Sequence, residues 1–174
     1  MVAAKHPSIT FCIEPGRYVV AASGVLLVRV HQLKHKGPYR FVGVSAGMNH
    51  LIRPALYQSY HHIVNLSKYD DMYLRLARAD LDHSANVAAV EEHKVDGTAD
   101  VSHFDATAPV TESLVVNVVG PICESGDFLG QNRVFPRCTD EGDVVLVDTV
   151  GAYGRAMACN YNLRAPGPEF VLDL

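Results

Sequence analysis

The sequence predicts a mainly β domain, a sandwich or small barrel with a few short helices. Short runs rich in β-branched residues alternate with glycine-bearing turns, helical signals are few and short, and no internal repeat is present. With 174 residues, 48% of them hydrophobic, the chain is long enough to bury roughly 70% of the surface of its unfolded form. We therefore treat residues 1–174 as a single β domain.

Residues 8–65 form the first part of this domain, because they are densely apolar and show repeated strand signals. ITFCIEPG, residues 9–16, predicts a strand. The next stretch, 17–34, begins as one or two helical turns of small residues and then alternates as a half-buried strand does. The two faces of that strand are expected to hold Val28, Val30 and Leu33 on one side and Arg29, His31 and Lys34 on the other.

A hairpin and a helix are expected to complete the first part. GPYR at 37–40 predicts the turn, and RFVGVSAG at 40–47 returns as the second strand of the hairpin. Residues 49–66 place apolar side chains near helical spacing, with Pro54 best placed in the first turn.

The remainder divides into an insertion and a second β part. Residues 67–112 are acidic and hold few large apolar groups after Leu81, so we expect a mobile surface insertion. Residues 113–174 resume the β pattern. The strands expected there are 113–121, 142–154 and 169–174.

Composition argues against several classes of partner. The charged fraction is 20% and the net charge is −4, with both signs spread along the chain, so nothing attracts nucleic acid or an anionic membrane. No apolar run reaches the roughly 18 residues that span a bilayer, and the N-terminus lacks the pattern of a signal peptide. We expect a cytoplasmic protein that binds neither nucleic acid nor membrane.

Neither a disulfide framework nor a metal site is predicted. The four cysteines lie far apart without C-x-x-C spacing, so we expect free thiols. His61 and His62 are adjacent and would point about 100° apart on a helix, which prevents them from sharing a metal as i, i+4 ligands do.

Three short motifs have the residues of an anion site. EPGR, residues 14–17, would turn free backbone N–H groups outward beside a guanidinium; a plain turn with a surface arginine is the alternative. Arg53 and Tyr57 of RPALY share one helix face and could bind one carboxylate; the alternative is a solvated arginine beside a packed tyrosine. Tyr153 of GAYG lies between glycines, where a ligand could approach the backbone or where the chain simply turns.

A fourth motif pairs a thiol with a carboxylate. Cys123 and Glu124 lie in the loop GPICESGD, and a neighbouring carboxylate favours the protonated, proton-donating thiol. The alternative is a buried cysteine, acting as a small hydrophobe, beside an exposed carboxylate.

Taken in order, these motifs resemble a known family. EPGRYVVAASGVLL, FVGVSAGMNHLIRPALY, VVGPICESGD and GDVVLVDTVGAYGRAMACNYN are similar, in order and approximate spacing, to the C-terminal part of the diaminopimelate decarboxylases. The resemblance implies the alanine-racemase-like fold type of pyridoxal-phosphate (PLP) enzymes. In that type a (β/α)8 barrel bears the Schiff-base lysine, and the β domain, a barrel or sandwich, closes the site across a homodimer.

The resemblance also implies roles for individual residues. Glu14, Pro15, Gly16 and Arg17 would hold the cofactor phosphate, and Tyr153 would contact both phosphate and substrate. The distal carboxylate of meso-diaminopimelate would be bound by Arg17, Arg53 and Tyr57. Glu124 would pair with the distal ammonium in the neighbouring subunit's site, and Cys123 would return a proton to Cα after carbon dioxide leaves.

The N-terminal barrel is expected to lie outside this chain, upstream in a longer protein or in a separate chain. None of the five lysines, Lys5, Lys34, Lys36, Lys68 and Lys94, stands in a motif that resembles the family's cofactor lysine, so we expect the isolated chain to be inactive.

Two alternatives remain open. One is a non-catalytic binding or regulatory module that keeps the decarboxylase dimer surface. The other is a decarboxylase of a related basic amino acid, although ornithine-type relatives usually have Cys-Asp at the place of Cys123-Glu124 and lack RPALY.

Overall fold

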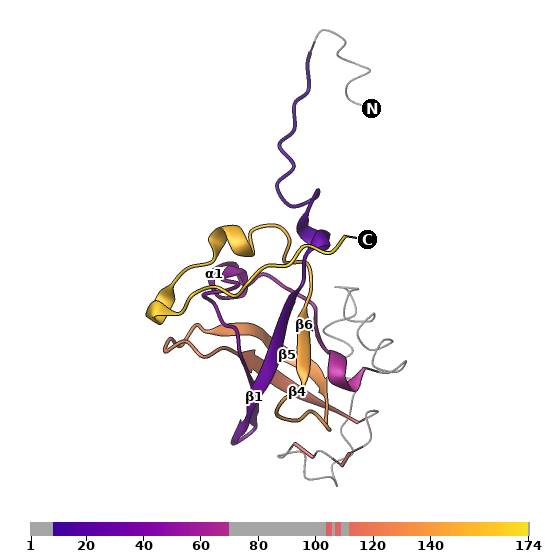
Figure 1. The fold of residues 1–174 in the computed structure, drawn as a ribbon. Helices are drawn as coiled ribbons and strands as arrows, with labels where there is room; N and C mark the ends of the chain where they lie inside the picture. Colours follow the sequence, from indigo (N-terminus) through magenta and orange to yellow (C-terminus); the bar gives the residue numbers. More distant parts are fainter. Residues whose placement is uncertain (1–8, 70–103, 106, 109–111, 174) are drawn as a thin grey trace.

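A six-stranded sheet organises the computed structural model, which describes residues 9–69, 104–105, 107–108 and 112–173 (Figure 1). The strands are β1 (Leu26–Lys36), β2 (Tyr39–Val44), β3 (Ile63–Asn65), β4 (Ser113–Val119), β5 (Phe128–Pro136) and β6 (Val144–Val147). Their order is β3-β6-β1-β2-β4-β5; β2 and β4 are parallel and the other pairs are antiparallel. The edge strands β3 and β5 touch, so the sheet nearly closes into a barrel and the predicted fold class is confirmed.

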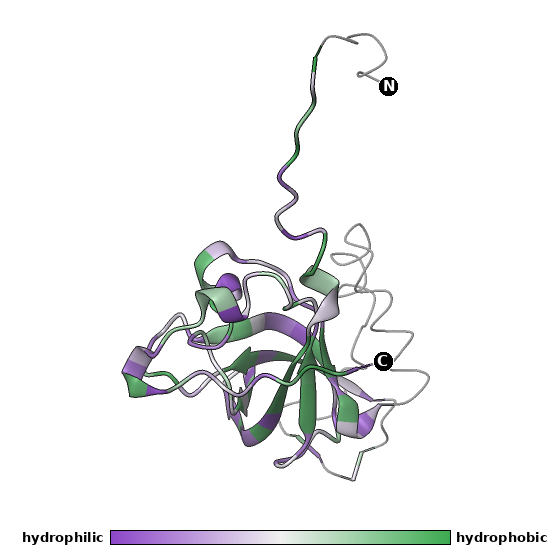
Figure 2. Cartoon of the chain, turned by 45° about the horizontal axis from the view of Figure 1, so that its top comes forward, coloured by the Kyte–Doolittle hydropathy of each residue, from purple (hydrophilic) through white to green (hydrophobic). Residues whose placement is uncertain are grey.

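Branched aliphatic residues fill the interior of this sheet. Hydrophobic positions concentrate on the strands (Figure 2), because alternate side chains of each strand point to the inner face. The buried residues of the core cluster include Val28, Val30, Val42, Val44, Val116, Val118, Leu129, Phe135, Val145 and Val147. Burial of these side chains is the main source of stability for the frame that supports the loops.

The predicted hairpin is confirmed, with one irregularity that explains its face pattern. Val28 and Val30 of β1 are buried, and the pairing with β2 shifts between Val30 and Gln32. This β-bulge adds one residue to β1, so Leu33 rather than Gln32 packs against the core.

Helical structure is shorter than predicted. The only α-helix among the described residues is α1 (Arg53–Tyr57), with Pro54 in its first turn as expected. Gln58 ends it in the left-handed conformation with φ 54°, and residues 63–65 then form β3. The helix predicted over 49–66 is therefore wrong outside α1. Short 3₁₀ turns complete the set: η2 (Ala21–Ser23), η3 (Leu66–Lys68), η4 (Arg155–Met157) and η5 (Tyr161–Leu163).

Two predicted strands are wrong, and two strands, β3 and β5, were missed. Residues 9–16 and 169–173 form no strand, and neither segment pairs with a strand of the sheet. The first of these segments extends away from the sheet (Figure 1). The pattern in 142–154 forms a strand only over β6, and β5 was not predicted at all.

Most of the acidic stretch 67–112 lies outside the described residues. Among all the residues that the structure describes, no helix has the length and apolarity needed to cross a membrane.

Candidate functional site

An open pocket of about 360 Å³ lies beside α1. Its lining consists of Arg53 and Tyr57 from α1, Tyr153 from the GAYG turn and Met157 from η4. The structure thus brings together three residues singled out in the sequence and adds Met157.

Arg53 is the central cation of this pocket. Its Cζ atom lies 5.5 Å from the ring centroid of Tyr57 and 5.7 Å from that of Tyr153. The Nη2 group donates to Ser59 Oγ at 3.2 Å, whereas the buried Nε–H has no protein partner. A guanidinium held between two aromatic rings with donor capacity left over is suited to bind an anion in the pocket.

The EPGR segment reaches the same pocket through Gly16. A Cβ atom at Gly16 would lie 2.8 Å from the Tyr153 hydroxyl, so the glycine permits a close approach of backbone and phenol. Glu14 and Pro15 are exposed, and Arg17 is half-buried with an Nε–H that is buried and has no protein partner. Backbone, hydroxyl and guanidinium groups therefore gather at one place.

Backbone contacts fix the GAYG turn against the segment that follows EPGR. Gly151 N donates to Ala21 O at 3.0 Å and Val150 N donates to Gly24 O at 2.9 Å. Gly24 and Gly151 pack so closely that a Cβ on Gly24 would lie 2.8 Å from Gly151 Cα. Tyr153 itself has φ 62°, a left-handed conformation that turns the backbone sharply.

His61 belongs to the same region and was not predicted as a functional residue. It is buried, and its Nδ1–H donates to Asp148 O at 2.9 Å, which leaves Nε2 as a buried acceptor without a protein partner. Burial lowers the pKa of His61, and the charges of Arg17, Arg53 and Arg133 lower it further. The imidazole is therefore neutral near these three arginines, of which Arg53 lines the pocket.

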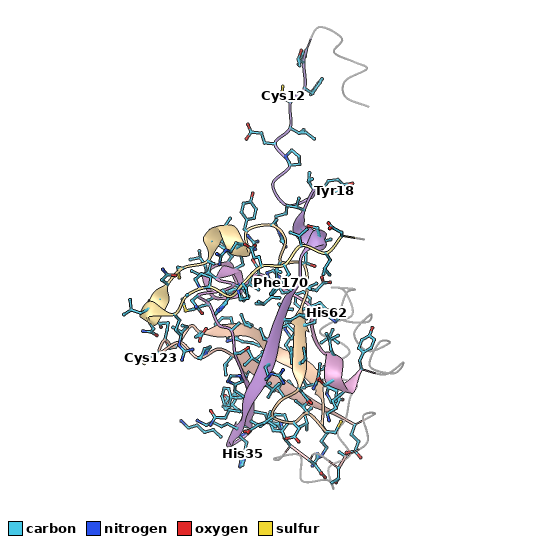
Figure 3. All side chains as sticks on the ribbon, viewed as in Figure 1. Cys12, Tyr18, His35, His62, Cys123 and Phe170 are labelled. Atoms are coloured by element: carbon cyan, nitrogen blue, oxygen red, sulfur yellow. The ribbon has the colours of Figure 1, made fainter. Side chains whose placement is uncertain are left out.

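Cys123 and Glu124 lie on a different loop and do not line the pocket. Both are exposed, so the interpretation of Cys123 as a buried hydrophobe is wrong. Cys123 N donates to Asn162 Oδ1 at 2.9 Å, which ties the loop to η5. Figure 3 shows Cys123 at one edge of the domain, far from Tyr18, the neighbour of Arg17. All four cysteines are free, as predicted.

Hydrogen bonds keep Glu124 ionised. Ser125 Oγ donates to its Oε1 at 3.0 Å and Gly126 N at 3.4 Å, while Tyr161 OH donates to its Oε2 at 3.3 Å. These donors, Ser125 first, lower the pKa of Glu124, and the carboxylate in turn raises the pKa of Tyr161. An exposed carboxylate fixed in this way is suited to bind a cation.

Comparison with known sequences identifies relatives for the chain. A family model described as the pyridoxal-dependent decarboxylase C-terminal sheet domain matches residues 17–151. Diaminopimelate decarboxylase of Neisseria meningitidis serogroup A is 38% identical over 161 residues, which is 92% of this chain and 29% of that relative. The enzyme of the same name from Escherichia coli K12 is 37% identical over 174 residues, 97% of this chain and 33% of the relative.

Solved structures agree. Diaminopimelate decarboxylase from M. jannaschii in complex with L-lysine has 33% sequence identity and a TM-score of 0.59, over 88% of this chain and 26% of that one. Lysine/ornithine decarboxylase from Vibrio vulnificus in complex with cadaverine, at 16% identity and a TM-score of 0.58 over 88% of this chain and 30% of that one, shares the fold.

The chain spans a third or less of the length of these curated relatives. The family model nevertheless covers most of it and coincides with the sheet described above. The chain therefore belongs to the pyridoxal-dependent decarboxylases and corresponds to their C-terminal sheet domain.

Proposed function

We propose that this chain is the C-terminal part of a diaminopimelate decarboxylase, which converts meso-diaminopimelate to L-lysine and carbon dioxide. Relatives of that name at 37–38% identity and the arginine-bearing pocket support this activity. The observation that carries the proposal is Arg53, a guanidinium set over Tyr57 and Tyr153 at an open pocket, with a buried Nε–H that has no protein partner.

The residues near Gly16 fit a cofactor phosphate. A Cβ atom at Gly16 would lie only 2.8 Å from the Tyr153 hydroxyl, and the Arg17 Nε–H lacks a protein partner. We infer that the segment Glu14, Pro15, Gly16 and Arg17, together with Tyr153, holds the phosphate of PLP through N–H groups, a hydroxyl and a guanidinium. When bound, PLP supplies the electron sink for the electron pair that carbon dioxide leaves behind.

Arg53 and Tyr57 bind the carboxylate that the substrate keeps. A planar guanidinium can donate two parallel hydrogen bonds to a carboxylate, and the Tyr57 hydroxyl on the same helix face adds a third donor. We infer that Arg17 contributes a further guanidinium to the same carboxylate. Because L-lysine retains this distal carboxylate, the same residues bind the product.

Glu124 acts at the same distal end of the substrate, whereas Cys123 acts at Cα, the opposite end. The ionised Glu124 pairs with the distal ammonium, and the exposed Cys123 thiol donates a proton to Cα once carbon dioxide has left. Since neither residue lines the pocket of its own chain, we infer a homodimer in which this loop reaches the partner's site.

The remaining parts of the active site come from a barrel. We infer that a (β/α)8 barrel, upstream in the same protein or in another chain, supplies the cofactor lysine, so that residues 1–174 alone are inactive. The chain contributes one sheet domain, interrupted by the acidic insertion 67–112.

Replacement of Arg53 tests the proposed substrate. In an active assembly with a barrel, Arg53→Ala should raise the apparent dissociation constants of meso-diaminopimelate and L-lysine more than tenfold, because a charge-assisted pair is lost. Cadaverine, a diamine without a carboxylate, should bind with less than a twofold change. Isothermal titration or competitive inhibition would measure these constants.

Arg29→Ala is the matched control. Arg29 of β1 donates to Gly142 O at 2.9 Å and does not line the pocket. Its removal should leave all three constants unchanged. If Arg53→Ala weakened the binding of cadaverine and of L-lysine equally, Arg53 would not bind the carboxylate.

A further inference from the structure

A buried carboxylate joins the Cys123-Glu124 loop to a loop that is distant in sequence. Asp127 is 5% exposed. Its Oδ1 accepts from Met48 N at 2.6 Å and its Oδ2 accepts from Ile122 N at 2.6 Å. One side chain thus satisfies two backbone N–H groups on separate loops, with short, charge-assisted hydrogen bonds.

Two glycines make this arrangement possible. Cβ atoms at Gly47 and at Gly120 would both collide with the Asp127 carboxylate, and one at Gly120 would also collide with Gly47 Cα. The two loops are therefore packed around the carboxylate, and no larger side chain fits at either position without displacing it.

Backbone hydrogen bonds extend the connection to the functional residues. Gly120 N donates to Asp127 O at 3.1 Å, and Asp127 N donates to Glu124 O at 3.1 Å, so the loop is closed across its base. The N–H group held by Oδ2 belongs to Ile122, directly before Cys123. On the other side, Met48 precedes α1, the helix of Arg53, by only a few residues.

We propose that Asp127 is a positioning residue that fixes the Cys123-Glu124 loop relative to the loop leading into α1. The carboxylate touches neither substrate nor cofactor; it sets the backbone from which the thiol and the Glu124 carboxylate project. In a homodimer this contact joins the loop serving one active site to the helix serving the other. The inference rests on the proposed function as far as it concerns turnover, whereas the loop geometry is independent of it.

The test compares Asp127→Asn with Asp143→Asn. Asparagine keeps the size of the side chain, but its NH₂ group must face one of the two N–H donors. Asp143 is a matched control, since it is 8% exposed and its Oδ2 accepts from Asn65 Nδ2 and Asp140 N, both at 2.9 Å. Both variants should lower the melting temperature, because both disturb a buried, hydrogen-bonded carboxylate.

Only Asp127→Asn should loosen the loop. Hydrogen exchange followed by mass spectrometry on the chain should show at least tenfold faster exchange in peptides covering 120–127 and 47–51. In the assembly with a barrel half, kcat should fall at least tenfold while the dissociation constant of PLP stays within twofold. Asp143→Asn should change neither exchange in these peptides nor kcat.

Each unfavourable outcome has a separate meaning. Unchanged exchange in 120–127 for Asp127→Asn, or equal losses of kcat in the two variants, would overturn the positioning role. An assembly with wild-type chain that makes no lysine would instead overturn the proposed function, and the exchange experiment would still decide whether Asp127 fixes the loop.

Discussion

At the scale of single residues, His61 is a buried imidazole surrounded by positive charge. Arg17, Arg53 and Arg133 all lower the pKa of this buried imidazole, after burial itself, which is the largest cause. A protonated His61 would add a fourth positive charge to the cluster. The neutral form instead keeps an unoccupied acceptor at Nε2, while its Nδ1–H donates to Asp148 O.

His61 should make stability depend on pH. Its folded-state pKa lies below the ordinary value of 6.5, so between those two values the unfolded chain binds a proton that the folded chain does not. The free energy of unfolding should therefore be constant above that range and fall as pH drops below 6.5. His61→Gln should make this decline shallower, as measured by urea unfolding between pH 8 and about 5.

His50 provides the comparison. Burial lowers its pKa as well, although Asp127 opposes the shift. His50→Gln should also make the fall in the free energy of unfolding shallower, and the variant with both substitutions should show the smallest fall. A wild-type pH dependence in His61→Gln would mean that its imidazole does not titrate as described.

The sequence predicted the pocket residues better than the residues that support them. Arg53 and Tyr57 follow from i, i+4 spacing, a local rule that α1 obeys. The role of Asp127 depends on Met48, 79 positions away, and that of His61 on Asp148, 87 positions away. Contacts of this kind arise only when the strands are assembled, and no local pattern marks them.

At the scale of elements, the close approach of two turns determines where Tyr153 lies. The GAYG turn contacts the segment after EPGR through Gly24 and Gly151. A Cβ at Gly151 would collide with Val20 O and would lie 2.9 Å from Ser23 Oγ. The close packing of Gly24 and Gly151 thus holds Tyr153 near the EPGR segment, the two proposed parts of the phosphate site.

Gly151→Ala should therefore separate the two turns. We expect it to lower the free energy of unfolding by about 1–3 kcal/mol through overpacking, and to weaken PLP binding in the assembly because Tyr153 moves. Urea denaturation and cofactor titration measure the two effects. Gly126→Ala is the control, since a Cβ there meets nothing within 4 Å; equal effects in the two variants would contradict the steric explanation.

Strand prediction succeeded where residues alternate and failed where they do not. β1 was found because buried valines alternate with exposed polar residues, and β2 because it follows the turn predicted at 37–40. β5 was missed because FLGQNRVFP interrupts its apolar positions with glycine and polar residues, and its place is set by pairing with β4. The segment 9–16 has the composition of a strand but no neighbouring strand among the described residues.

At the scale of the whole molecule, exposed apolar side chains near both ends of the chain are typical of an interface with a partner. Ile9, Phe11 and Ile13 alternate along the extended N-terminal segment and are 52–84% exposed. Phe170, Val171 and Leu172 near the C-terminus are 79–90% exposed. Such groups favour association, and the proposed barrel is the partner that would cover them.

The measurement that tests the proposed activity most directly is reconstitution. The chain is mixed with PLP and meso-diaminopimelate, with and without the separately expressed barrel half of an active diaminopimelate decarboxylase, and L-lysine formation is followed. The same barrel half with its own sheet domain serves as the positive control. We expect lysine from the mixture and none from either part alone. A stable complex that forms no lysine, while the positive control does, would contradict the assignment and leave a binding module with the residues of an enzyme.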